Sequence, residues 1–83
     1  MSDQLSNEDK LNIAEAHLKN LLYNQYNLQL SLKEAQAATI PNQATCDNLN
    51  LQLTDNAAQQ AVVGDEIATI KAAIAADAAK ATK

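Results

Sequence analysis

Few side chains in this sequence could do chemistry, and those that could stand apart from one another. His17 has no second histidine or cysteine at a metal-ligand spacing, and Glu15, two residues away, points elsewhere on a helix. Cys46 is the only cysteine, and its neighbour is Asp47 rather than a basic residue that would favour a reactive thiolate. The sequence therefore predicts a partly exposed helical histidine and a small, buried apolar cysteine.

The acidic pair Asp65 and Glu66 does not suggest hydrolytic chemistry either. Adjacent residues of a helix project to different faces, so these carboxylates do not converge on one substrate atom. The chain contains a single glycine, which excludes a glycine-rich phosphate-binding loop. We therefore expect no catalytic residues, no metal ligands, no cofactor and no cofactor-binding residues, and we do not expect an enzyme.

The charge of the chain disfavours two classes of partner. Its 83 residues include 10 acidic and 6 basic side chains, for a net charge of −4, and every one of the basic residues is a lysine. Phosphate recognition needs a basic stripe and commonly arginine, so we expect neither nucleic-acid binding nor binding to an anionic membrane surface. No apolar run approaches the roughly 20 residues of a membrane span, and the N-terminal residues lack the pattern of a secretory signal. The expectation is a soluble protein, cytoplasmic by default or part of a virion, with export by a dedicated apparatus left open.

The strongest pattern in the sequence is a seven-residue apolar repeat on either side of the only proline, Pro41. Apolar residues spaced 3.5 apart form one seam on a helix, and such a seam must be covered by another helix. The predicted core residues of the seam are Leu11, Leu18, Leu21, Leu28, Leu32, Leu49, Leu53, Val63, Ile67, Ile70 and Ile74. The pattern predicts an all-α fold, a long antiparallel helical hairpin resembling a coiled coil.

The helix boundaries follow from capping and turn residues. Ser6 is a suitable N-cap, so we expect a first helix at about 6–38, a turn at 39–43 around Pro41, and a second helix at about 44–79. Either Asn42 or Thr45 would cap the second helix. Residues 1–83 then form one domain with frayed ends. Gly64 leaves a choice between one helix, continuous or kinked, and a break giving three helices; the unbroken phase of the repeat favours the continuous helix.

Centring the hairpin on Pro41 pairs residues whose numbers sum to about 82 or 83. Three polar residues interrupt the seam, and this arithmetic places all of them in one layer: Gln25, Asn56 and Gln60. A buried polar layer fixes the register of paired helices and the number of partners, at some cost in stability.

A second apolar surface lies away from the seam and is the candidate interface: Tyr23, Tyr26, Leu30, Leu51 and Val62. Of the 39 apolar residues 17 are alanine, and a core of this size rarely supplies more than about 3–5 kcal/mol. A lone hairpin would be marginal, so we expect copies of the chain or a partner protein to share the burial. The interpretation that follows is a structural or assembly protein, an oligomer or a subunit that packs into a larger helical bundle.

Two further expectations concern the partner. An arginine-free helical chain rich in Asn, Gln and Ala would suit an accessory component of a viral particle, in particular a tailed phage; this rests on composition and on no motif. The alternative is a small regulatory binding module, an adaptor or inhibitor, that covers one partner protein with its outer apolar residues. Self-association or incorporation into a multimer favours the first function, and a one-to-one complex favours the second.

Overall fold

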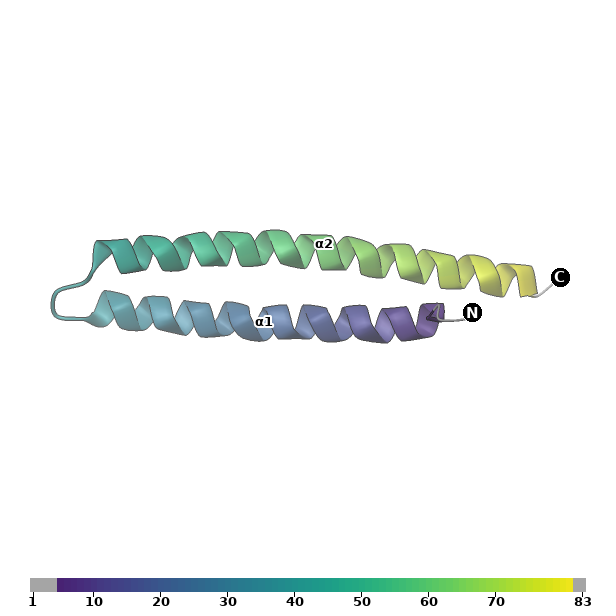
Figure 1. Cartoon of the computed structure of the whole chain (residues 1–83), viewed down its shortest axis with the longest axis horizontal. Helices are drawn as coiled ribbons and strands as arrows, with labels where there is room; N and C mark the ends of the chain where they lie inside the picture. The colour runs from purple at the N-terminus through teal and green to yellow at the C-terminus, as the bar shows by residue number, and fades with distance from the viewer. Residues whose placement is uncertain (1–4, 82–83) are drawn as a thin grey trace.

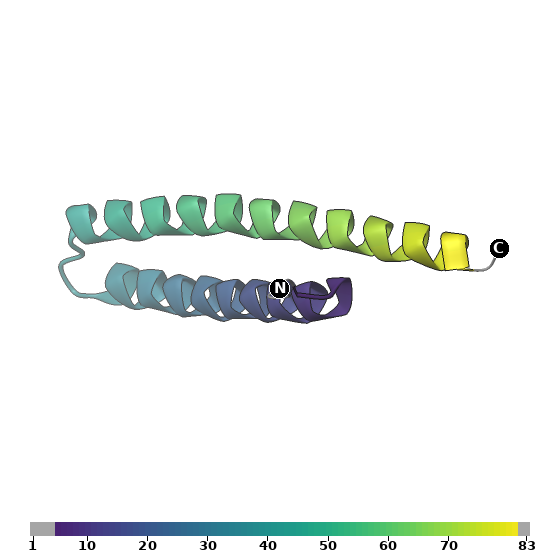
Figure 2. The ribbon, with the colours of Figure 1, turned by 45° about the vertical axis from the view of Figure 1, so that its right-hand side comes forward.

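The computed structural model describes residues 5–81 and consists of two long antiparallel helices joined by a short turn (Figures 1 and 2). Helix α1 spans Asn7–Ala37 and helix α2 spans Gln43–Ala81. The predicted all-α hairpin is confirmed, and the described residues contain no strand. Of the predicted frayed ends, residues 1–4 and 82–83 lie outside the described residues, whereas residues 80–81 are helical, so α2 ends two residues later than predicted.

Both helices begin at a side-chain cap. The Asp9 amide donates to the Ser6 hydroxyl oxygen at 3.1 Å, and Ser6 itself has an extended backbone, as an N-cap does. The Thr45 amide donates to the Asn42 side-chain oxygen at 3.1 Å. Of the two candidate caps for the second helix, Asn42 therefore fills the role, and α2 begins one residue earlier than the sequence predicts.

The turn of residues 38–42 is set by the approach to Pro41. Ala38 has an extended backbone, with φ −61° and ψ 146°, and α1 ends at the preceding residue. Pro41 cannot continue a helix and restricts the residue before it to extended conformations. Ile40 projects from this turn and is 86% exposed.

Helix α2 is continuous through Gly64, so the three-helix alternative is wrong. The backbone of Gly64 is helical, with no positive φ. The 39 residues of α2 and the 31 of α1 correspond to about 58 and 46 Å at 1.5 Å per residue. The longer helix extends past the start of α1 at the open end, away from the turn (Figure 1).

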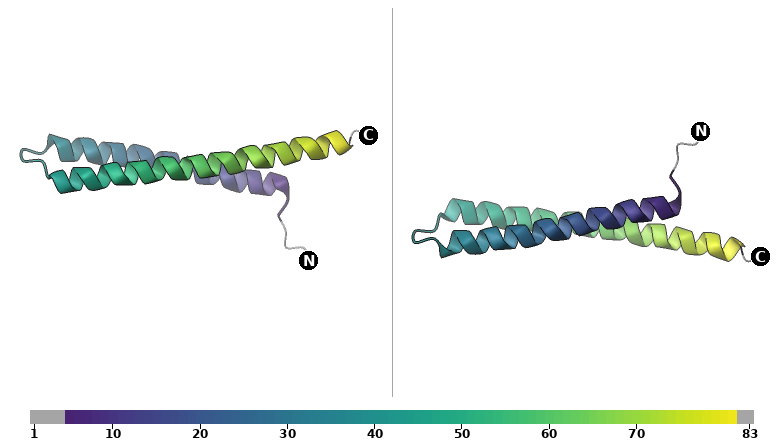
Figure 3. Two further views of the ribbon diagram at one scale, coloured as in Figure 1. Left: turned by 90° about the horizontal axis from the view of Figure 1, so that it is seen from above. Right: turned by 90° about the horizontal axis from the view of Figure 1, so that it is seen from below.

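The hairpin has one seam and no thick core. The helices cross at a shallow angle, as Figure 3 shows from above and below. Ile67 and Ile70 of the predicted core residues are buried, and Cys46 is buried near the turn. The other predicted core residues are half-buried: Leu11, Leu18, Leu21, Leu28, Leu32, Leu49, Leu53, Val63 and Ile74. The two helices alone leave much of this seam in contact with solvent.

Candidate functional site

The most buried polar side chain of the described residues is Asn56, which is 4% exposed. Its amide nitrogen donates to the backbone carbonyl oxygen of Leu21 on α1 at 2.9 Å. Its side-chain oxygen accepts a hydrogen bond from the amide nitrogen of Gln60, one turn further along α2. Both ends of the Asn56 amide are thus satisfied, which removes most of the cost of burying it. Because the Leu21 carbonyl has one position along α1, this contact fixes how far the helices slide past each other.

Gln25 does not join this network. It is half-buried on α1, but within the described part of the chain it makes no hydrogen bond to Asn56 or Gln60. The structure therefore brings together two of the three predicted polar residues and adds a backbone carbonyl. The Leu21 carbonyl oxygen can accept this bond because an oxygen that is already bonded along its own helix keeps a second lone pair. Every residue has such a carbonyl, so the pattern of side chains cannot show which one Asn56 will reach.

The register of the hairpin follows from two contacts between the helices. Asn56 bonds Leu21, and near the open end the Asn7 amide nitrogen donates to a carboxylate oxygen of Asp77 at 3.3 Å. These pairs sum to 77 and 84, so they bracket the predicted pairing sum of 82 or 83. The helices are held at their middle and at their open end, while the turn holds the third point.

The predicted outer residues are all exposed to solvent. Leu51 and Val62 are 65% and 68% exposed, and Tyr23, Tyr26 and Leu30 are exposed as well. The Lys19 ammonium nitrogen lies 5.8 Å from the centre of the Tyr23 ring, close enough for a weak cation–π contact at the surface. Single exposed apolar side chains are common on protein surfaces, so their exposure places these residues outside the seam and does not by itself identify an interface.

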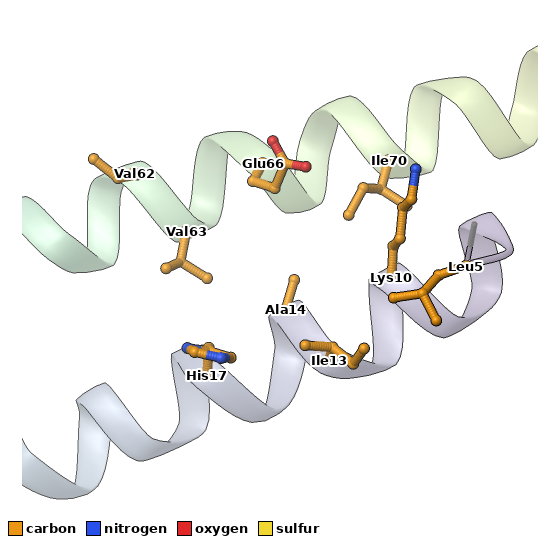
Figure 4. A pocket seen from close by; sticks show the side chains of 9 residues that line it. All are labelled: Leu5, Lys10, Ile13, Ala14, His17, Val62, Val63, Glu66 and Ile70. Atoms are coloured by element: carbon orange, nitrogen blue, oxygen red, sulfur yellow. The ribbon is translucent and has the colours of Figure 1, made fainter. Parts of the chain in front are cut away.

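One of these five residues, Val62, lies in a groove between the helices near the open end (Figure 4). The groove has a volume of about 400 Å³. Its walls are formed by Leu5, Lys10, Ile13, Ala14, His17, Val62, Val63, Glu66 and Ile70. We call this the open-end groove. Leu5 and Ile13, which are 50% and 47% exposed, are the large apolar residues of this surface that sequence reasoning missed.

The same side of the hairpin changes character toward the turn. A second hollow shares His17, Val62 and Val63 with the open-end groove and continues it to Leu21 and Ala58. Beyond it the lining becomes polar and consists mainly of Asn24, Asn27, Ser31, Gln52, Asp55 and Gln59. We call this polar stretch, beyond the second hollow, the polar half of the groove side. The sequence offers a signal for both stretches, since these residues flank the seam on one side, but the seam itself dominated the pattern.

The residues that could do chemistry remain apart in the structure. His17 is exposed at the edge of the open-end groove, and Cys46 is a buried, free cysteine near the turn. No group of three or more His, Cys, Asp or Glu residues within 5–81 is placed to hold a metal ion. Neither described helix is long and apolar enough to cross a membrane. The candidate sites of this chain are three surface features: the open-end groove, the polar half of the groove side and the exposed outer residues.

Comparison with protein-family models, with curated proteins and with solved structures finds no match to this chain.

Proposed function

We propose that this chain is a structural or assembly protein, a helical-hairpin subunit that packs with copies of itself or into a larger complex. The observation that carries the proposal is the large surface left uncovered by two helices. The hairpin exposes 6167 Å², whereas a compact monomer of its 8.9 kDa mass would expose about 4,800 Å². Part of this exposed surface is apolar, because the seam is half-buried and large outer side chains face solvent.

The outer residues Tyr23, Tyr26, Leu30 and Leu51 supply contacts to further subunits in this proposal. Tyrosine is well suited to such contacts, because it buries a large apolar ring and keeps a hydroxyl for hydrogen bonding. Leu30 and Leu51 sum to 81 and so lie at one level of the hairpin, on different helices. Composition extends the proposal to an accessory component of a virus particle, in particular a tailed phage. Catalysis has no part in it.

The regulatory module remains the second candidate function, favoured by the open-end groove. A groove of about 400 Å³ between two helices could receive one apolar segment of a partner protein. This function predicts a hairpin that is a helical monomer by itself and binds one partner in a one-to-one complex.

Light scattering on a dilution series, with circular dichroism on the same samples, tests the proposal. A discrete helical multimer that loses helicity on dilution supports the assembly protein. A helical monomer that is stable to dilution rejects it in favour of the regulatory module.

The variant Tyr26→Asp tests the outer residues. It should leave helicity largely unchanged and abolish association beyond the smallest multimer, because it places a charge in an apolar contact. Gln29→Asp is the matched control, since it adds the same charge at a nearby exposed position of α1. Loss of helicity in Tyr26→Asp alone would mean that this residue stabilises the hairpin itself.

A further inference from the structure

We propose that the groove side of the hairpin is the surface on which two copies of this chain pair, forming an antiparallel four-helix bundle. The two-fold axis runs parallel to the helices, so α1 of each copy lies on α2 of the other and both turns are at the same end. This inference rests on the proposed assembly function and specifies its first contact. It leaves Tyr23, Tyr26, Leu30 and Leu51 uncovered for larger assemblies.

The open-end groove of one copy can pack against the same groove of a second copy. Both helices contribute large apolar side chains to it at different levels along the groove, Ile13 from α1 and Val62 from α2 (Figure 4). A two-fold axis along the groove sets Ile13 of one copy near the α2 wall of the other, and the reverse contact follows by symmetry. Each copy thereby covers the exposed side chains of the other.

The charges at the groove select this arrangement over its antiparallel counterpart. Lys10 projects from α1 and Glu66 from α2 into the same groove, yet they form no ion pair with each other or with other described residues of the chain. With the axis along the helices, Lys10 of one copy is on the face that meets α2 of the other, the helix that carries Glu66, and symmetry doubles this attraction. Turning one copy end over end would instead set α1 on α1, with Lys10 near the α1 residues of the polar half around Asn24, which carry no charge.

The polar half of the groove side supports the same geometry. In the proposed dimer the amide and hydroxyl side chains that α1 contributes, such as Asn27 and Ser31, meet those that α2 of the other copy contributes, such as Gln52. The single carboxylate of this stretch, Asp55, then faces amides rather than another carboxylate. An end-over-end arrangement would bury apolar residues against part of this polar surface, at the cost of unsatisfied polar groups.

The area is sufficient for a stable dimer. The face shared by the two helices is about 46 Å long, from the 31 residues of α1, and about 20 Å wide, two helix diameters. Its outline is about 900 Å², of the same order as the roughly 800 Å² that each partner buries in an interface of standard size. The hairpin thus has one face of suitable size, with a basic side chain on one helix and an acidic one on the other.

Val62→Asp should weaken the dimer about 100-fold or more, measured as the Kd from light scattering or sedimentation. Ala61→Asp is the matched control, because it adds the same charge to the same helix at the neighbouring exposed residue, which does not line the groove. Ala61→Asp should leave the dimer Kd within about threefold of the wild-type value. Circular dichroism at high protein concentration establishes that each variant remains helical.

A charge reversal tests the proposal without adding a charge to the apolar surface. Lys10→Glu and Glu66→Lys should each weaken the dimer about tenfold, because each removes two attractive contacts and creates two repulsive ones. The double variant should recover the wild-type Kd within about threefold. Equal Kd values for all three variants would overturn the proposed pairing of α1 with α2.

A distance measurement decides the direction of the two copies. A nitroxide label on Ile40→Cys in a Cys46→Ala background sits in the exposed turn. The proposed dimer places the two labels about 20–35 Å apart, across one bundle, whereas end-over-end pairing separates them by more than about 50 Å. The longer distance overturns the proposed axis.

Failure of this inference differs from failure of the proposed function. A multimer that survives Val62→Asp and both charge reversals but is lost in Tyr26→Asp rejects the groove as the contact and retains an assembly protein. A wild-type chain that remains a helical monomer at every concentration rejects both.

Discussion

The open end and the middle of this hairpin are held together by different means. At the open end α2 contributes β-branched apolar side chains to the seam, of which Ile67 and Ile70 are buried, and α1 contributes Leu11 and Ala14. At the middle the most buried residue is Asn56, whose amide bridges to a backbone carbonyl of α1. The groove side follows the same division, apolar beside the first region and polar beside the second.

The two regions make different contributions: the open end stabilises the pairing of the helices, and the middle fixes their register. The turn restrains the nearer half of the helices, while the open end has no covalent connection and depends on burial to remain closed. Apolar contacts stabilise but tolerate sliding, because a seam of similar side chains can pair in several registers. Asn56 supplies little net stability for its burial, but its partner is a single carbonyl oxygen. The buried apolar residues therefore lie at the open end, where the helices could separate. The directional hydrogen bond of Asn56 lies at the middle, where the helices could slide past each other.

The largest effect should come from a charge at the buried open end. Ile67→Asp places a carboxylate in the seam without a partner, which should cost about 4 kcal/mol or more, as much as a core of this size supplies. We expect the isolated hairpin to lose most of its helical circular dichroism signal. Leu51→Asp, with the same charge on an exposed residue of α2, should stay helical. Equal loss of helicity in both variants would show that α2 depends on contacts outside the seam.

A smaller effect is expected at the middle, where two polar residues can be compared. Asn56→Ala removes the bond to Leu21 and the acceptor of Gln60, so it should lower the free energy of unfolding by about 1–3 kcal/mol. Gln25→Ala removes a half-buried amide that bonds neither of the other two residues, and should cost about 0.5 kcal/mol or less. Urea denaturation of both variants measures the difference. A larger loss of unfolding free energy for Gln25→Ala than for Asn56→Ala would indicate that Gln25 does take part in the polar layer.

Much of this fold could be predicted from the sequence, because a helical hairpin is specified by local signals. The seven-residue repeat identifies one face of each helix, Pro41 supplies the only break, and Ser6 and Asn42 have the side chains that cap helices. The continuity of α2 was also predictable, since a break at Gly64 would have reset the repeat. Each of these signals acts within a few residues of the chain.

The candidate surface was less predictable, because it depends on how the helices lie side by side. Val62 can be assigned to the outside from the repeat, but its place on the wall of a groove depends on α1 residues across the hairpin, such as His17. The partner of Asn56 is a backbone atom, which no pattern of residue types records. The seam is local in origin, whereas the groove and the bridge are products of pairing.

A further effect, smaller than those of Ile67→Asp and Asn56→Ala, is expected at Gly64, opposite the groove side. Residues two apart on a helix point to opposite sides, so Gly64 faces away from Val62 and Glu66. A Cβ added at Gly64 would meet no atom within 4 Å, and an interior glycine is about 1 kcal/mol less favourable than alanine. Gly64→Ala should therefore raise the melting temperature by about 4–8 °C and leave the dimer Kd unchanged.

The two readouts of Gly64→Ala locate the contact between copies by exclusion. If two copies meet on the groove side, the added methyl group lies outside the contact and only the stability of the helix changes. If they meet on the opposite side, the methyl group holds the helices apart where glycine allows close approach, and the dimer weakens although the helix itself is strengthened. A higher melting temperature combined with a weaker dimer would therefore move the contact from the apolar groove to the side of Gly64.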